Sequence, residues 1–194
     1  MNIACIEQIN PVDYIVGLAR QFGLTYTTAP DLANQYKNWL YLLDTGNVHQ
    51  MKIGNPPNVA GWTAYYQAPS YHELWINAET LRRKKEFTDK LITSNNNGMS
   101  FDILGFTAAL GNPSDPNTLI SEVIELFHVV SDDATIVGKL KSILLSNQTT
   151  DYYWTTAWDA YVAAPTNATN LNTVRTRLRT FYQAVTGMAE CLLS

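Results

Sequence analysis

The sequence has little charge and almost no cysteine. Charged residues make up 15% of its 194 positions, and 13 basic against 17 acidic residues give a net charge of -4. Such a balance provides no general electrostatic attraction to nucleic acid or to an anionic membrane, so nucleic acid is not an expected partner. The two cysteines, Cys5 and Cys191, lie near opposite ends without a metal-type spacing. Buried thiols are expected, with a bridge between the ends as the alternative.

Long apolar runs are also missing. No window approaches the run of about 18 apolar residues that a membrane-spanning helix requires, and we expect no membrane span. The first residues, MNIACIEQINP, lack the basic start and the apolar stretch of a signal peptide. Taken alone, these features favour a cytoplasmic protein.

Catalytic and cofactor motifs are lacking too. The chain has no Gly-x-Ser-x-Gly elbow and no glycine-rich phosphate loop. Its three histidines, His49, His72 and His128, show no metal-ligand spacing. We therefore expect no metal and no cofactor, and favour a non-catalytic protein. The alternative is an enzyme whose histidines or carboxylate pair meet only in the fold.

What the sequence does contain is helix punctuation. Hydrophobic residues make up 46% of the chain, enough for a single helical domain over residues 1–194. Caps, prolines, glycines and apolar steps of three and four predict about seven helices and no strand. These helices are expected at residues 11–22 and 30–46, after Asn77, after Asp115, after a Ser131 cap, after Thr150 or Asp151, and around 171–192. The stretch near 99–115 predicts a loop or short helix. The fold class is therefore all-α, an irregular bundle with one long aromatic-rich loop.

Two of the predicted helices carry clear apolar stripes. The second helix has Leu32, Tyr36, Trp39, Leu40 and Leu43 at helical spacing, and the last has Leu171, Val174, Leu178, Phe181, Val185, Met188 and Leu192. Such a stripe normally faces the core, and we expect the leucine-rich end of the second helix to be fully buried. The basic run at 82–85 is expected on a solvated helix face.

The long loop is predicted at residues 47–74, where periodicity disappears. Loops of that length are usually functional or packed by their own side chains. Aromatic residues gather across this segment at Trp62, Tyr65, Tyr66, Tyr71 and Trp75, and again on one short helix at Tyr152, Tyr153, Trp154, Trp158 and Tyr161. Exposed rings of this kind stack on sugars or anchor protein partners. The alternative, which we favour for most of them, is that they fill a core.

The loop also carries a family resemblance. NPPNVAGW, followed by LWINAETLRRKKEF, resembles the signature of domain of unknown function family 1800, a bacterial family. The matching positions are Pro56, Pro57, Asn58, Val59, Gly61 and Trp62, then Trp75, Ile76, Asn77 and Leu81. The segments INPVDYIVGLARQFG and KLKSILLSNQTTDYYW resemble further parts of the family. Its members are usually much longer, and this chain resembles their C-terminal portion. The spacer between Trp62 and Trp75 is longer here than in the family.

The resemblance implies an exported protein, periplasmic or at the cell surface, with the cytoplasm as the alternative. It also implies a partner, because members are often encoded beside a sulfatase-like companion family. Our first hypothesis is a non-catalytic helical module that binds a partner protein or a glycan. The alternatives are a hydrolase or accessory subunit of polysaccharide-related metabolism, and a structural half of a longer protein. The candidate binding or signature residues are Asn55, Pro56, Pro57, Asn58, Gly61, Trp62, Tyr65, Tyr66, Tyr71, Trp75 and Asn77. We expect Trp62 to pack against the helix that begins at Asn77, which would make the loop a structural clamp.

Overall fold

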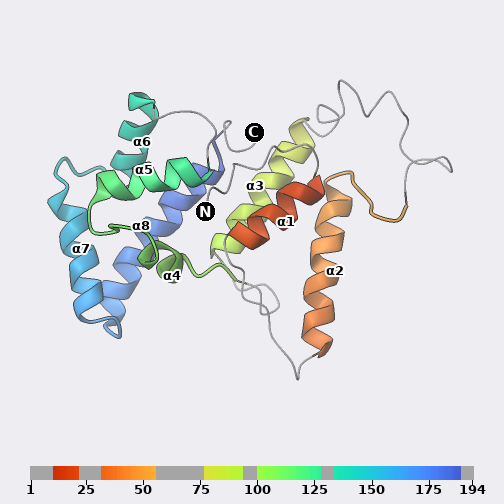
Figure 1. The fold of residues 1–194 in the computed structure, drawn as a ribbon, viewed down its shortest axis with the longest axis horizontal. Helices are drawn as coiled ribbons and strands as arrows, with labels where there is room; N and C mark the ends of the chain where they lie inside the picture. The colour runs from red at the N-terminus through yellow and green to blue at the C-terminus, as the bar shows by residue number, and fades with distance from the viewer. Residues whose placement is uncertain (1–10, 22–31, 56–76, 94–99, 128–132, 189–194) are drawn as a thin grey trace. The chain divides into compact units, whose positions relative to one another are not determined.

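The computed structural model describes residues 11–21, 32–55, 77–93, 100–127 and 133–188, and it is all-α (Figure 1). Within these ranges it has eight helices and no strand. They are α1 (Pro11–Gln21), α2 (Leu32–Val48), α3 (Ala78–Thr93), α4 (Ile103–Ala108), α5 (Pro116–Phe127), α6 (Ala134–Leu144), α7 (Tyr152–Ala163) and α8 (Ala168–Thr186). The prediction of an all-α bundle is confirmed. The additional helix is α4, in the stretch predicted as a loop or short helix.

The eight helices fall into two compact units. One unit holds α1, α2 and α3, and the other holds α4 to α8. We call them the α1–α3 unit and the α4–α8 unit. The expectation of a single domain over residues 1–194 stays a prediction.

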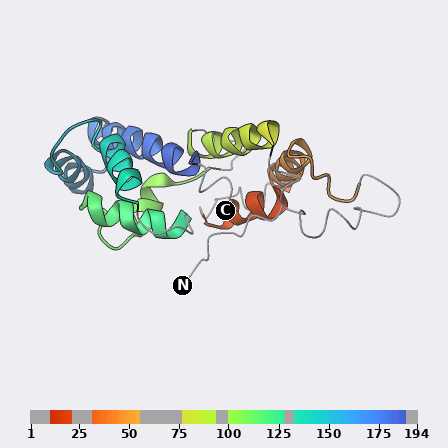
Figure 2. The ribbon, with the colours of Figure 1, turned by 90° about the horizontal axis from the view of Figure 1, so that it is seen from above.

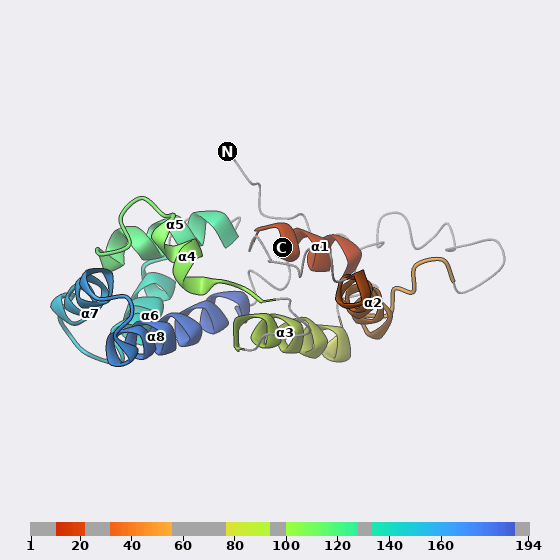
Figure 3. The ribbon, with the colours of Figure 1, turned by 90° about the horizontal axis from the view of Figure 1, so that it is seen from below.

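Helix α8 is the centre of the α4–α8 unit. It contacts α4, α5, α6 and α7, and Figures 2 and 3 show α6 and α7 beside it. Its stripe residues Val174, Leu178, Phe181 and Val185 are all fully buried. The helix begins after Asn167, whose side chain accepts a hydrogen bond from the backbone N–H of Thr169 at 2.9 Å. The predicted stripe is therefore confirmed over these four positions, because neighbouring helices cover it.

The aromatic cluster on α7 divides between core and surface. Trp154 and Trp158 are buried and stack with ring centroids 5.7 Å apart. The indole N–H of Trp154 donates to the carbonyl of Pro113 at 2.8 Å, which satisfies its one polar atom. Tyr152 and Tyr153, in contrast, are 70% and 45% exposed. The expectation that aromatic rings fill a core is thus met by the two tryptophans.

Helix starts follow the predicted capping chemistry, with one correction. The Asn77 side chain accepts from the backbone N–H of Thr80 at 3.0 Å, and the carboxylate of Asp115 accepts from the N–H of Thr118 at 3.1 Å. Both caps were expected. The cap of α6 is Asp133, which accepts from the N–H of Thr135 at 2.7 Å. The prediction that Ser131 caps this helix is therefore wrong, since the helix begins two residues later.

In the α1–α3 unit, α1 and α3 bury conventional apolar faces. Tyr14, Ile15 and Leu18 of α1 and Phe87 and Leu91 of α3 are nearly inaccessible to solvent. The α3 sequence is more charged than any other helix here, and its outer face carries ion pairs between residues four or three apart, such as Lys85 with Asp89 at 2.9 Å.

Lys84 is an exception within the basic run of α3. The run was expected on a solvated face, yet Lys84 is only 4% exposed. Its ammonium lies 4.8 Å from the ring centroid of Tyr14, where the ring face attracts a cation. The prediction is wrong at this position, because the side chain crosses toward α1 and lies against an aromatic ring.

Candidate functional site

Helix α2 turns polar residues inward. Asn38, Thr45 and His49 are 0%, 6% and 1% exposed, although none of them is apolar. The hydroxyl of Thr45 donates to the carbonyl of Tyr41 at 2.7 Å, one turn back along the helix. Neither polar atom of the Asn38 side chain has a hydrogen-bond partner. An unsatisfied buried polar group costs about 1–3 kcal/mol, so this inner face is an unusual one for a small helical unit.

The opposite face of α2 is apolar and exposed. Its members are Leu32 (58% exposed), Tyr36 (59%), Trp39 (50%), Leu40 (55%) and Leu43 (38%). We call these five residues the α2 outer face. The rings of Tyr36 and Trp39 meet edge to face, with centroids 5.2 Å apart. The prediction that this stripe is buried is therefore wrong, because α1 and α3 lie against the polar side of the helix.

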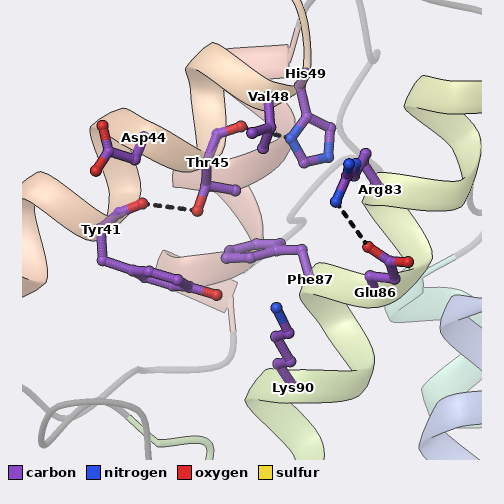
Figure 4. Close-up of a pocket in the computed structure, with 9 residues that line it drawn as sticks. All are labelled: Tyr41, Asp44, Thr45, Val48, His49, Arg83, Glu86, Phe87 and Lys90. Atoms are coloured by element: carbon purple, nitrogen blue, oxygen red, sulfur yellow. Dashed lines mark hydrogen bonds and ion pairs between the residues drawn. The ribbon is translucent and has the colours of Figure 1, made fainter.

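A pocket of about 210 Å3 lies between the C-terminal half of α2 and α3 (Figure 4). It is lined by Tyr41, Asp44, Thr45, Val48, His49, Arg83, Glu86, Phe87 and Lys90. The α2 residues recur at spacings of three and four, so one face of the helix forms one wall. The α3 residues follow the same spacing and form the opposite wall. The pocket thus lies where two helix faces meet, and both belong to the α1–α3 unit.

His49 gives the pocket its most specific polar atom. Its Nδ1 lies 2.6 Å from the carbonyl oxygen of Thr45. A carbonyl can only accept, so in the neutral ring Nδ1 carries the proton and Nε2 is left with a lone pair. Nε2 is buried and makes no hydrogen bond. The imidazole is therefore held at the Thr45 carbonyl, and its Nε2 is enclosed by protein.

The surroundings keep this ring neutral. Burial is the largest cause that lowers the pKa of His49, and the positive charges of Lys84 and Arg83 lower it further. The Thr45 carbonyl and the Arg83 backbone act in the opposite direction but do not reverse the shift. The ring of Tyr14 on α1 also faces the imidazole, with centroids 6.5 Å apart. At neutral pH the imidazole is therefore uncharged.

The remaining charges around the pocket balance one another. Arg83 lies 3.3 Å from Glu86 and 2.8 Å from Glu79. Hydrogen bonds from Arg82 and Arg83 lower the pKa of Glu79. These groups are partly exposed, so their ion pairs hold side chains in place more than they stabilise the fold. Two carboxylates and two cations line the pocket, which gives it no net charge from these groups.

Of the predicted signature residues, Asn55 and Asn77 lie within the described parts of the chain. Asn55 is exposed at the end of the turn after α2. Asn77 caps α3, and its amide also donates to the side-chain oxygen of Gln50 at 3.3 Å, which ties α3 to the end of α2. Asn77 is therefore a structural cap. The other candidates lie outside the described residues: Pro56, Pro57, Asn58, Gly61, Trp62, Tyr65, Tyr66, Tyr71 and Trp75. The packing of Trp62 on α3 stays a prediction for the same reason.

Metal binding finds no support in the part of the chain that the structure describes, where no group of three or more histidine, cysteine or acidic residues gathers. His72 and His128 lie outside it. From the sequence, His49 has a predicted role only in the alternative of an enzyme whose histidines or carboxylate pair meet in the fold. A signal was present, because Asn38, Thr45 and His49 fall at steps of seven and four. The apolar stripe on the other face is the stronger periodic pattern, and it predicted that the opposite side of the helix is buried.

Comparisons with known proteins return nothing for this chain: no family model, no curated protein and no solved structure matches it. Among the described residues, no helix has both the length and the apolar character needed to cross a membrane. Any functional assignment therefore rests on the residues of this chain.

Proposed function

We propose that this chain is a non-catalytic helical binding module and that the α2 outer face is the surface that binds a partner protein. The observation that carries the proposal is the burial pattern of α2. Its polar residues Asn38 and Thr45 are buried, and five large apolar residues are exposed to solvent. Exposed apolar residues that are contiguous on one helix are typical of interaction sites. Tryptophan and tyrosine are also the residues that contribute most to binding at such sites.

The spacing of the α2 outer face favours one type of partner. Tyr36, Trp39, Leu40 and Leu43 stand at positions i, i+3, i+4 and i+7, the anchor pattern of a helix that inserts into an apolar groove. Only two charged residues, Lys37 and Asp44, occur on α2, so a charged partner surface would gain little from the contact. The partner is therefore a protein with an apolar groove about three helical turns long.

The family resemblance supplies a first partner to test. It favours a bacterial exported protein and the sulfatase-like companion encoded beside such chains. It also leaves two other occupants of the α2 outer face, a glycan stacked on the aromatic rings and a second copy of this chain. Each of these two occupants would be detected by its own measurement, sedimentation for a second copy and a glycan panel for a glycan.

The test measures the affinity of the purified companion protein for this chain by titration calorimetry. Trp39→Ala and Leu43→Ala are expected to weaken binding at least tenfold each, since a truncated anchor commonly costs more than 1.4 kcal/mol. The matched control is Tyr152→Ala on α7, which removes a ring that is 70% exposed in the other unit. It should leave the affinity unchanged.

Three outcomes would overturn the proposal. Equal losses with Trp39→Ala and Tyr152→Ala would show that α2 has no special role. A concentration-dependent dimer in sedimentation that Trp39→Ala abolishes would assign the α2 outer face to a second copy. Binding to a glycan panel that is lost with Trp39→Ala, without binding to the companion, would replace the protein partner by a glycan.

A hydrolase is the second candidate function, and one observation favours it. The neutral His49 lines a pocket and has its Nδ1 held by the Thr45 carbonyl at 2.6 Å. An imidazole oriented through one nitrogen acts as a general base if a movement of the chain exposes the other nitrogen to a substrate. Chromogenic ester, glycoside and sulfate-ester substrates test it. Turnover that His49→Asn abolishes would establish the hydrolase, and no turnover above buffer with any substrate would exclude it for these classes.

A further inference from the structure

We infer that the groove of the partner protein carries two opposite charges along one of its edges, an acidic group that meets Lys37 and a basic group that meets Asp44. These two pairs fix the direction in which α2 enters the groove. The inference rests on the proposed function, because it names the chemistry of the partner at the α2 outer face. Its evidence is the position of the two charges on α2 and the contacts that they make within the chain.

The two charges lie on one edge of the α2 outer face. Lys37 and Asp44 are both exposed and stand seven residues apart, which is about 20° short of two helical turns and a rise of about 10 Å. Leu40 is 55% exposed and lies between them, at spacings of three and four. Residues at these spacings share one side of a helix. This edge therefore presents an apolar residue between two opposite charges.

The other edge of the α2 outer face is uncharged. Gln35 and Leu42 stand there, and Lys37 and Asp44 are the only charged residues of α2. When a helix is turned end to end in a groove, with the same face toward the floor, its two edges exchange sides. A groove with complementary charges on one edge therefore pairs with α2 in a single direction, and such charges set register more than affinity.

Neither charge has an ion-pair partner in the part of the chain that the structure describes. The Lys37 ammonium donates to the side-chain oxygen of Asn34 at 3.4 Å, and the Asp44 carboxylate accepts from the side-chain amide of Asn47 at 3.4 Å. Both distances exceed the usual range of about 2.7–3.2 Å, and both neighbours are neutral. Figure 4 shows the Asp44 carboxylate directed away from His49. Each charge is therefore available to an opposite charge of another molecule.

Helix α3 shows the contrasting arrangement. Arg82 lies 2.7 Å from Glu79, and Lys85 lies 2.9 Å from Asp89. These charges are three or four residues apart and pair within one helix. The two charges of α2 are separated by about 10 Å along the helix, too far to pair with each other. Opposite groups on a partner therefore replace no pair that α2 already makes.

Charge reversals test the inference with the purified companion protein. Lys37→Glu and Asp44→Lys each replace an attraction by a repulsion, and each is expected to weaken binding about threefold to tenfold at about 0.1 M NaCl. The double variant with both changes should weaken binding further, because the charges of the partner stay in place. Both positions are exposed, so the circular dichroism of the variants should match that of the unaltered protein.

Salt separates a charge effect from a structural one. The screening length falls from about 10 Å at 0.1 M to about 3 Å at 1 M, so at about 1 M NaCl the charge variants should approach the affinity of the unaltered protein. Trp39→Ala removes an apolar anchor and should remain weak at both concentrations. The matched controls are Lys139→Glu on α6 and Glu125→Lys on α5, at exposed positions of the other unit. They make the same changes in net charge and should leave the affinity unchanged.

Each failure has its own pattern. Full affinity of both single reversals, with binding lost in Trp39→Ala, would overturn the inference and leave the proposed function in place. Losses as large in Lys139→Glu as in Lys37→Glu would assign the effect to net charge and also overturn it. Unchanged binding in Trp39→Ala, or no binding of the companion, would overturn the inference together with the proposed function.

A second copy of this chain gives the opposite result for the double variant. Two antiparallel α2 helices would place Lys37 of each copy beside Asp44 of the other, so reversal of both charges restores both pairs. A dimer in sedimentation that each single reversal weakens and the double variant restores would therefore assign the charges to a second copy. The inference of a partner groove would then be wrong.

Discussion

Helices α8 and α2 carry similar apolar stripes, but the stripe of α8 is buried and the stripe of α2 is exposed to solvent. In α8 the residues of the stripe, such as Leu178 and Phe181, are completely buried. In α2 the equivalent residues, such as Trp39 and Leu40, are half exposed. Both stripes repeat at steps of three and four, so the periodicity alone does not distinguish them. An apolar stripe predicts that one face of a helix becomes buried. It does not indicate whether residues of the same chain or of another molecule bury it.

The difference follows from the neighbours of each helix. Helix α8 contacts α4, α5, α6 and α7, and these surround its stripe. In the part of the chain that the structure describes, α2 has its main contacts with α1 and α3. Tyr14 of α1 faces His49, and residues of α3 line a pocket together with Thr45 and His49. Four neighbours suffice to bury a stripe inside the chain, whereas the contacts of α2 among the described residues leave its outer face exposed.

The largest expected effect lies in the covered stripe. Phe181→Ala on α8 removes a ring that is 0% exposed, and we expect it to lower the free energy of unfolding by about 3–5 kcal/mol. Urea denaturation followed by circular dichroism measures the loss. A change below about 1 kcal/mol would contradict the assignment of α8 to a close-packed core. Thr180→Ala, beside it on the exposed side of α8, is the control and should have a small effect.

The polar inner face of α2 gives the next largest effect, with the opposite sign. Asn38 is 0% exposed and both of its side-chain polar atoms lack partners. Asn38→Leu has a similar volume and no unsatisfied atoms, so we expect the free energy of unfolding to rise by about 1–3 kcal/mol. Asn38→Asp should instead lower it, because burial of a charged carboxylate carries a large desolvation cost. Destabilisation by Asn38→Leu would contradict the packing described for α2.

His49 makes the stability of the inner face depend on pH. Burial and nearby positive charges lower its pKa in the folded protein below the ordinary value of about 6.5. The unfolded chain therefore takes up a proton first as pH falls, which favours unfolding. The free energy of unfolding is expected to decrease from about pH 6.5 down to the lowered folded pKa and then to level off for this residue.

Measurement of urea midpoints across this pH range tests the prediction. The groups that face the imidazole are Lys84 and Arg83 from α3 and Tyr14 from α1. The part of the pH dependence that is due to His49 should vanish in His49→Asn. A decrease of the same size in both proteins would assign the effect to other groups, such as carboxylates that titrate at lower pH.

Much of the fold was predictable because it is local. Asn77, Asp115 and Asn167 sit at helix starts and hold backbone N–H groups, which short-range capping rules describe. The stripe of α8 was also predictable from its spacing. The cap of α6 was missed by two residues, since Ser131 and Asp133 both suit the role and only the folded chain selects one.

The orientation of α2 and the pocket could not be predicted in the same way. Both depend on which side of α2 meets α3, and that is decided by contacts between residues far apart in the sequence, such as the rings of Tyr41 and Phe87. His49 carries no motif, and its role arises from the Thr45 carbonyl and from burial. Spacing along one helix does not contain this information.

The smallest expected effect on stability is also the one that tests the comparison most directly. Trp39 is 50% exposed on α2, so Trp39→Ala should change the free energy of unfolding by no more than about 0.5 kcal/mol, although it removes a larger ring than Phe181→Ala does. A loss approaching that of Phe181→Ala would mean that this chain itself buries Trp39, and α2 would then be a core helix like α8. If Trp39→Ala leaves the free energy of unfolding nearly unchanged and abolishes partner binding, both stripes become buried in the functional state. The stripe of α8 is then buried by the same chain, and the stripe of α2 by another molecule.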